Sequence, residues 1–267
     1  MGSRGPRVRI SMKIVVAIKQ VPARDSQLRI DATGRWIEES DLAYEVNEPD
    51  AYALEAALRL KEEHGGEAIA LSAGPARVSQ AIREALAKGA DRAIHIEEDL
   101  GALDPLAAAR LLAAAVKTEA PDLVLTGLQS DDLGYGQTGV ILAELLGLPH
   151  ATIVMQVELR NGGIRVKREL ESGWFQHVEM PLPALLTVQS GISKLRYATL
   201  MGIKKARSKE VKRLKAADLG VTLESASVRL DRAYAPVRSK HAQLIAGEPR
   251  EAAERLVEKL RFEARVL

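Results

Sequence analysis

Apolar and polar positions alternate along this chain in a pattern that predicts a doubly wound α/β fold. Four short apolar runs are typical of buried parallel strands, and they occupy residues 13–18, 68–71, 93–96 and 123–126. Helical spacing of apolar residues separates these runs and follows the last of them. Because strands and helices alternate, we expect a mostly parallel sheet with right-handed crossovers and helices on both faces.

Polar signals mark where the predicted helices begin and where the chain turns. Asn47 fits an N-cap, and Asp50 stands at the third helical position, where a carboxylate can reach back to the cap. Asp104 fits another N-cap, with Pro105 at the first helical position. Before the first of these helices, residues 28–37 fit a short hairpin whose apolar side chains face inward.

The hydrophobic period changes after Pro149. Three alternating segments predict an antiparallel meander added to the sheet, and they cover residues 153–159, 164–166 and 174–178. Asn161, Gly162 and Gly163 predict the first turn of this meander. A last apolar strand is predicted at 184–188, beside the parallel strands.

The chain divides by composition into three parts. Residues 1–11 are basic and lack a core pattern, so we interpret them as a leader segment or an artificial extension ahead of a domain of residues 12–203. Residues 204–267 contain a basic run and then a tail, in which a helical pattern covers 248–263. A tail with so little core signal seldom packs alone, so we expect this extended C-terminal arm to lie on another subunit.

The most informative segment is the glycine loop from Thr126 to Gly139, TGLQSDDLGYGQTG. It joins the fourth apolar run to a helical pattern that begins at Val140. Its four glycines allow a ligand to approach the backbone closely, and the helix start adds unpaired N–H groups and a partial positive charge. The spacing matches neither Gly-x-Gly-x-x-Gly nor the Walker loop. A phosphate or nucleotide site and an ordinary surface loop both stay open.

Composition excludes several kinds of site. The chain has no cysteine, which excludes disulfides, thiolate catalysis, Fe–S clusters and Cys-ligated zinc. The five histidines show no metal-binding spacing. The 38 Lys and Arg residues nearly cancel the 36 Asp and Glu residues, which gives no overall field for nucleic acid. Because no apolar run has the length of a membrane span, we expect a cytoplasmic protein without membrane insertion.

Several segments follow one another in an order that is more specific than any single motif. They are VAIKQV, VNEPDAYALEAALRLKE from Val46 to Glu62, SAGP, KGADR, the glycine loop, VKRELE, PALLT, RYATL and DLGV. Taken in this order, from Met12 to about Leu223, they resemble the β subunit of electron transfer flavoprotein, the FixA-like family.

This resemblance implies an electron carrier rather than a stand-alone enzyme. In the family, an α subunit carries the redox-active FAD, and the β subunit supports it and holds AMP, or a second FAD in electron-bifurcating members. The implied partners are the α subunit, flavin dehydrogenases such as acyl-CoA dehydrogenases, and a quinone oxidoreductase. The Gln-Thr-Gly end of the glycine loop favours AMP, whereas the run from Asn47 is nearer to bifurcating members. A nucleotide-binding sensor of this fold, without redox partners, is a third alternative.

Carried over by position, the resemblance implies a nucleotide site at the carboxyl ends of parallel strands, where open α/β sheets bind ligands. The implied residues are Ala17, Asn47, Glu48, Pro49, Asp50, Ala73, Gly127, Leu128, Gln129, Ser130, Asp131, Asp132, Leu133, Gly134, Tyr135, Gly136, Gln137 and Thr138. We expect the phosphate on the amides between residues 134 and 139. Asp131 and Asp132 fit such a site if they point at ribose hydroxyls or cap the loop.

The adenine is expected against small or apolar residues at the strand ends, namely Val16, Ala17 and Ala73. All of the implied places are expected to follow parallel strands. The plainer alternative for Asn47 and Asp50 is that they only cap a helix.

Residues 188–210 resemble the loop by which the family recognises dehydrogenases. Leu200 matches the anchoring leucine, and Tyr197 stands beside it with lysines on either side. An apolar anchor held out on a loop with a charged rim suits brief electron-transfer encounters. The plainer interpretation of the basic run from Lys204 to Arg213 is a solvated face, and without interleaved aromatic residues it does not predict a nucleic-acid site.

Overall fold

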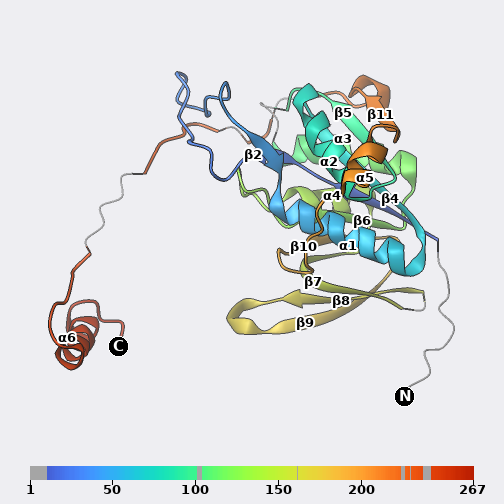
Figure 1. The fold of residues 1–267 in the computed structure, drawn as a ribbon. Coiled ribbons are helices and arrows are strands. Elements are labelled where there is room, and N and C mark those ends of the chain that lie inside the picture. The colour runs from blue at the N-terminus through green and yellow to red at the C-terminus, as the bar shows by residue number, and fades with distance from the viewer. Residues whose placement is uncertain (1–10, 101–103, 161, 224–225, 229, 237–241) are drawn as a thin grey trace, which may run out of the picture.

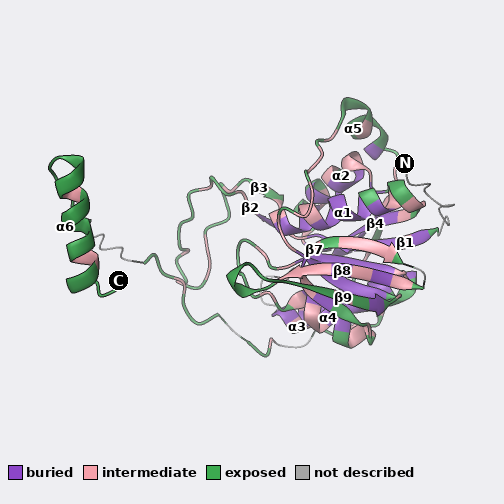
Figure 2. Cartoon of the chain, turned by 90° about the horizontal axis from the view of Figure 1, so that it is seen from below, coloured by how far each residue is buried: buried purple, intermediate pink, exposed green. Residues whose placement is uncertain are grey.

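A mixed sheet passes through the molecule, with its central strands buried on both faces (Figures 1 and 2). The computed structural model describes residues 11–100, 104–160, 162–223, 226–228, 230–236 and 242–267. Within these residues the sheet has nine strands, which in spatial order are β11 (Val211–Leu214), β5 (Arg92–Glu97), β4 (Gly66–Gly74), β1 (Met12–Ala17), β6 (Leu123–Gly127), β10 (Ala184–Val188), β7 (His150–Arg160), β8 (Gly163–Glu169) and β9 (Phe175–Pro181).

The strands from β11 to β7 pair in parallel, and β8 and β9 add an antiparallel meander. This arrangement confirms the predicted doubly wound fold with its added meander. The turn predicted between the first two meander strands includes Asn161, which lies outside the described residues.

Helices cover the parallel strands on both faces. On one face lie α1 (Glu48–His64) and α2 (Ser79–Lys88), and on the other lie α3 (Pro105–Glu119) and α4 (Thr138–Leu146). Side chains of β1 alternate between the two cores, because successive residues of a strand point to opposite faces. Ile14 therefore packs with α1 and α2, and Val15 packs with α3 and α4. Burial on both faces explains the continuous apolar run in the sequence.

Short helical turns link some of these elements. They are η1 (Ala76–Val78), η2 (Glu171–Gly173) and η3 (Ala217–Leu219). The N-cap predicted at Asp104 is confirmed, because its Oδ1 accepts a hydrogen bond from Ala107 N at 2.9 Å. The other carboxylate oxygen, Oδ2, accepts hydrogen bonds from the amides of Ser227 and Val228. One carboxylate thus caps α3 and holds the start of the C-terminal arm.

The segment between β1 and α1 differs from the prediction. Two strands, β2 (Gln20–Pro22) and β3 (Tyr44–Val46), form a small antiparallel sheet. The predicted hairpin is reduced to one antiparallel bridge between Ile30 and Ile37, and Leu28 and Ile30 are exposed rather than turned inward. The segment extends beyond the end of the main sheet (Figure 1), and Gly34 O accepts a hydrogen bond from Ala233 N of the C-terminal arm.

The basic run from Lys204 to Arg213 was predicted as a solvated face, and its lysines and arginines are mostly exposed, but the sequence did not predict its secondary structure. The run includes the end of α5 (Leu200–Ala206), and its continuation, β11, pairs with β5 at the edge of the main sheet. Lys212 and Arg213 are exposed on this strand, and charged side chains are common on edge strands because they oppose pairing with other chains. The sheet therefore includes residues beyond 203, the position at which composition placed the domain boundary.

The C-terminal arm ends in α6 (Pro249–Phe262), which confirms the helix predicted from its apolar spacing. This helix stands apart from the sheet (Figure 1), and none of its residues, all of which are described, is buried. Among the described helices, none combines the length and apolar character that crossing a membrane requires.

Candidate functional site

The carboxyl ends of β1, β4 and β6 meet at one edge of the sheet, beside the start of α1 and the glycine loop. The structure brings together at this edge the residues implied for the nucleotide. Ala17 ends β1, Ala73 lies near the end of β4, and Gly127 ends β6. Residues 128–137 form the glycine loop, most of which is exposed, and Thr138 begins α4.

Asn47 reaches this edge by a route that the sequence did not predict. It follows β3, which pairs antiparallel with β2, so the expectation that every implied place follows a parallel strand is wrong here. The pairing of β2 with β3 folds the chain back, and Asn47 N donates to Lys19 O at 2.9 Å. The start of α1 is thereby held next to the end of β1.

The buried carboxylate of Asp50 joins the ends of two strands. Its Oδ2 accepts from Lys19 N and its Oδ1 accepts from Gly127 N, both at 2.8 Å. Asp50 is only 6% exposed. Both oxygens bind amides of other segments, whereas the backbone amide of the cap residue Asn47 donates to Lys19 O. The sequence did not predict these contacts, because the two partners of Asp50 lie 31 and 77 residues away.

Asn47 has a similar role toward the glycine loop. Its Nδ2 donates to Gln129 O and its Oδ1 accepts from Asp131 N, both at 2.9 Å. The side chain makes no capping hydrogen bond to α1, although the residue occupies the N-cap position. The expected side-chain cap is therefore wrong. Asn47 instead fixes the first part of the glycine loop against α1.

Burial raises the pKa of Asp50 to about 6, because a charged carboxylate loses its hydration at this position. The hydrogen bonds from Lys19 N, Gly127 N and Asn47 favour the charged form and limit this rise. The strand ends are thus joined by a group that changes its protonation in mildly acidic solution.

Two glycines of the loop allow close packing at its ends. A Cβ on Gly127 would lie 2.7 Å from both Asp50 N and Pro49 Cβ, so a larger residue would displace the start of α1. A Cβ on Gly139 would lie 2.6 Å from Thr187 Cγ2 and 2.7 Å from Thr126 Oγ1. The two positions hold α1 and α4 tightly against the strands.

The middle of the loop presents backbone donors. Gly134 and Gly136 both have φ of +63°, a conformation that favours glycine. Within the described part of the chain, the amides of residues 135–139 find no hydrogen-bond acceptor. These donors lie at the start of α4, where the helix dipole adds a partial positive charge. The arrangement fits a phosphate group, to which the nearby hydroxyl of Thr138 could also donate.

The two loop aspartates are paired with cations. Asp132 accepts from Lys19 Nζ at 2.7 Å, and Asp131 lies 3.3 Å from Arg24 Nη2 and accepts from Glu48 N at 3.4 Å. Burial pushes the pKa of Asp132 upward, but Lys19 outweighs this effect and holds the pKa below its usual range. Both carboxylates therefore hold the loop in place, and their paired cations reduce the electrostatic repulsion between them and an anionic ligand nearby.

One expectation for the adenine fails. Val16 is completely buried in the core beneath α1, whereas Ala17 and Ala73 both pack with the opposite core. Adjacent strand residues point to opposite faces, so Val16 and Ala17 do not share a ligand surface. The two alanines remain the small residues at the strand ends.

The chain matches the family model of the electron transfer flavoprotein domain over residues 35–219. It is 37% identical to electron transfer flavoprotein subunit beta of Methylophilus methylotrophus, over 92% of this chain and 97% of that protein. The human subunit is 36% identical, over 96% and 99%, and that of Bacillus subtilis is 34% identical, over 96% and 100%.

The chain belongs to the electron transfer flavoprotein β-subunit family. The similarity covers nearly the whole chain, so it includes both the sheet and the C-terminal arm. Members of this family are electron transfer flavoproteins, which agrees with the resemblance found in the sequence.

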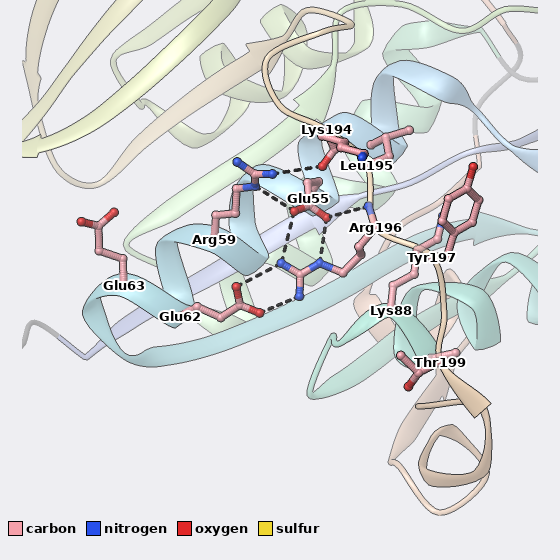
Figure 3. Close-up of a pocket in the computed structure, with 11 residues that line it drawn as sticks. Glu55, Arg59, Glu62, Glu63, Lys88, Lys194, Leu195, Arg196, Tyr197 and Thr199 are labelled. Atoms are coloured by element: carbon pink, nitrogen blue, oxygen red, sulfur yellow. Dashed lines mark hydrogen bonds and ion pairs between the residues drawn. The ribbon is translucent and has the colours of Figure 1, made fainter. Parts of the chain in front are cut away.

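The recognition segment that the resemblance implies comprises residues 188–210. Its residues 194–199 lie beside α1 and α2 (Figure 3). Tyr197 is 92% exposed and Leu200 is 87% exposed. Leu200 is the first residue of α5 rather than part of a loop, and Thr199 caps this helix by accepting from Gly202 N at 3.0 Å. The exposure of both side chains agrees with the prediction that they are held out from the surface.

Sequence reasoning missed four residues that shape these two regions. Lys19 and Arg24 brace the glycine loop, and Arg196 and Glu55 hold the recognition segment against α1. Lys19 lies two positions after the end of β1, at the edge where the ligand was predicted, so its position alone was a usable signal. The pairing of Arg196 with Glu55 spans 141 residues and left no sequence signal.

The raised pKa of Asp50 predicts a pH dependence of folding. The folded chain binds this proton more tightly than the unfolded chain, whose carboxyl has an ordinary pKa of 3.8. The contribution of Asp50 to the free energy of unfolding should therefore fall as pH rises from about 4 to about 6, by at most about 3 kcal/mol. Asp50→Asn should abolish this slope, measured by urea unfolding across the pH range.

Asp132→Asn is the control for this experiment, because the contribution of Asp132 to the free energy of unfolding should change with pH in the opposite direction. Because the pKa of Asp132 is lowered, its stabilising contribution is present above the ordinary carboxyl pKa and is lost as pH falls through the lowered value. A difference between wild type and Asp50→Asn that stays constant from pH 4 to pH 6.5 would contradict the assigned titration.

Proposed function

We propose that this chain binds AMP at the carboxyl edge of its sheet and serves as the β subunit of a heterodimeric electron transfer flavoprotein. In this proposal, an α subunit carries the FAD, and the heterodimer shuttles electrons from flavin dehydrogenases, such as acyl-CoA dehydrogenases, to a quinone oxidoreductase. The chain acts as a carrier subunit and not as a separate enzyme. The observation that carries the AMP site is the group of amides at residues 135–139, which have no hydrogen-bond acceptor among the described residues.

Three features support a phosphate at this position. The amides point from a glycine-rich turn that requires positive φ, and they lie at a helix start with partial positive charge. Asp131 and Asp132 are paired with cations and do not repel an anion with their full charge. Ala17 and Ala73 are the small residues at these strand ends, and neither side chain extends beyond Cβ.

The C-terminal arm supports the heterodimer. Leu244 is 98% exposed, and α6 carries the exposed apolar residues Leu256, Val257 and Phe262. A helix that buries no side chain on its own chain is rarely stable by itself, since tertiary packing supplies most helix stability. We propose that the α subunit covers this arm.

Nucleotide analysis of the purified heterodimer tests the proposal. This chain is co-expressed with its α subunit, the complex is denatured, and the released nucleotides are identified by chromatography. The expected result is one FAD and one AMP per heterodimer. Two FAD molecules and no AMP would identify the electron-bifurcating alternative, and the absence of any adenine nucleotide beyond one FAD would overturn the site at the glycine loop.

The glycine loop can be tested by the double substitution Gly136→Ala with Thr138→Val. Alanine disfavours the φ of +63° that the loop needs, and valine removes a hydroxyl beside these amides. Since hydrogen bonds to a charged group contribute about 1.5–3 kcal/mol, we expect AMP to be retained at least tenfold less during dialysis.

The matched control is Gly147→Ala, which strains a glycine of similar φ, +65°, at the far end of α4. It should reduce stability and leave AMP content unchanged. Full AMP occupancy in the double variant would show that other residues hold the phosphate.

The recognition segment can be tested by Leu200→Ala in the heterodimer. If Leu200 fills an apolar pocket of a dehydrogenase, its truncation should raise the KM for the heterodimer as electron acceptor by roughly 30-fold, with normal FAD content. Leu28→Ala removes an exposed leucine outside both the recognition segment and the C-terminal arm, and it should leave this KM unchanged. An unaltered KM in Leu200→Ala would remove the anchor from the proposal.

A further inference from the structure

Residues 194–198 belong to the connection from β10 to α5, form neither a helix nor a strand, and lie along α1 and the end of α2 (Figure 3). Within the described chain, their backbone makes hydrogen bonds to side chains of α1 and none to other backbone groups. Arg196 N donates to Glu55 Oε2 at 3.3 Å, and Arg59 Nη2 donates to Lys194 O at 3.1 Å. Side chains therefore determine the path of this segment.

Arg196 makes two bidentate ion pairs with α1. Its Nε and Nη2 donate to the two oxygens of Glu55 at 2.8 and 3.2 Å. Its Nη1 and Nη2 donate to the two oxygens of Glu62 at 2.6 and 3.1 Å. A planar guanidinium fits this double geometry, and the single ammonium of a lysine cannot reproduce it.

The two carboxylates that bind Arg196 lie on one face of α1. Glu55, Arg59 and Glu62 are spaced four and three residues apart, so they share one face of α1. The Glu55 side chain is 5% exposed. Burial pushes its pKa upward, but Arg196 and Arg59 outweigh this effect and hold the pKa below its usual range. A buried negative charge therefore strongly favours keeping Arg196 at this place.

The other end of the segment is also fixed. A Cβ on Gly202 would collide with the carbonyl oxygen of Ala87, so α5 packs directly on the end of α2. Ala206 is buried there, and Lys209 Nζ donates to Leu86 O at 2.9 Å. Tyr197 projects from the opposite side of the segment to the charged cluster (Figure 3). The exposed Tyr197 and Leu200 thus lie between two anchored residues, Arg196 on α1 and Gly202 on α2.

We propose that Arg196 is the positioning residue that orders the recognition segment before a flavin dehydrogenase arrives. This inference rests on the proposed docking at Leu200. Ordering a flexible segment during association weakens binding, and a segment that is already ordered avoids this loss. The double ion pair supplies that order, and the apolar side chains remain free for the partner.

The test uses the purified heterodimer in five forms: wild type, Arg196→Lys, Leu200→Ala, the two substitutions together, and Arg92→Lys. Arg92 on β5 is the matched control, because it also pairs with two carboxylates but lies outside the recognition segment. It contacts Glu67 of β4 at 2.8 Å and Glu119 of α3 at 2.5 Å. The measurements are FAD content, hydrogen exchange of residues 193–203, and kcat and KM with a purified acyl-CoA dehydrogenase that reduces the wild-type heterodimer.

We expect Arg196→Lys to raise KM about tenfold, with unchanged kcat and FAD content and faster exchange in residues 193–203. The double variant should be little worse than Leu200→Ala alone, because both substitutions act on the same contact. Arg92→Lys should leave KM unchanged. A wild-type KM in Arg196→Lys, or an equal rise in Arg92→Lys, would overturn the inference. A wild-type KM in Leu200→Ala would instead overturn the docking proposal on which it rests.

Discussion

The buried carboxylate of Asp50 is the contact on which the arrangement of the carboxyl edge depends. It accepts one amide from the chain after β1 and another from the end of β6, so it fixes the distance between two neighbouring strand ends and the start of α1. Asn47 extends the same connection to the glycine loop. The amides at the start of α4 are presented in one orientation because the loop before them is held at several points. A loop anchored only at its termini would have to lose much more conformational entropy on binding a ligand.

Helix α1 links the two regions to which we assign a function. Its first turn carries Asp50, and its second half carries Glu55, Arg59 and Glu62. A helix rises about 1.5 Å per residue, so these groups lie along roughly 18 Å of one rigid element. The carboxyl edge of the sheet and the recognition segment are therefore both held in position by side chains of the same helix. Each can be altered by substitution while the other keeps its own contacts.

The sequence predicted the parts of the fold that local pattern controls. Continuous apolar runs located the parallel strands, period-two alternation located the meander, and the Asp104-Pro105 signal located the start of α3. The glycine loop was identified because glycine spacing between a strand and a helix is itself local. The predictions that failed concern contacts between segments that are far apart in the sequence. The side chains of Asn47 and Asp50 had local capping partners available, and amides from distant segments took those places.

The basic stretch is mostly exposed, as its composition predicts, but the sequence did not predict its helix and strand. Lysines and arginines dominate residues 204–213, so composition predicted solvent exposure. Long cationic side chains can cap the end of a neighbouring helix while their stems cover apolar surface, and Lys209 does this for α2. An edge strand such as β11 also tolerates charges on its open side. Charge density alone therefore did not distinguish a loop from a helix and a strand.

The connection from β10 to β11 has a mechanical consequence. In the described sheet, β6, β1, β4 and β5 lie between these two strands, so residues 189–210 form a strap that crosses the helices on one face. The strap is hydrogen-bonded into the sheet at both ends. A pull exerted on α5 by a moving partner would be resisted by strand pairing rather than by a flexible hinge. A partner docked there as proposed would then move about a fixed pivot without loosening the subunit beneath it.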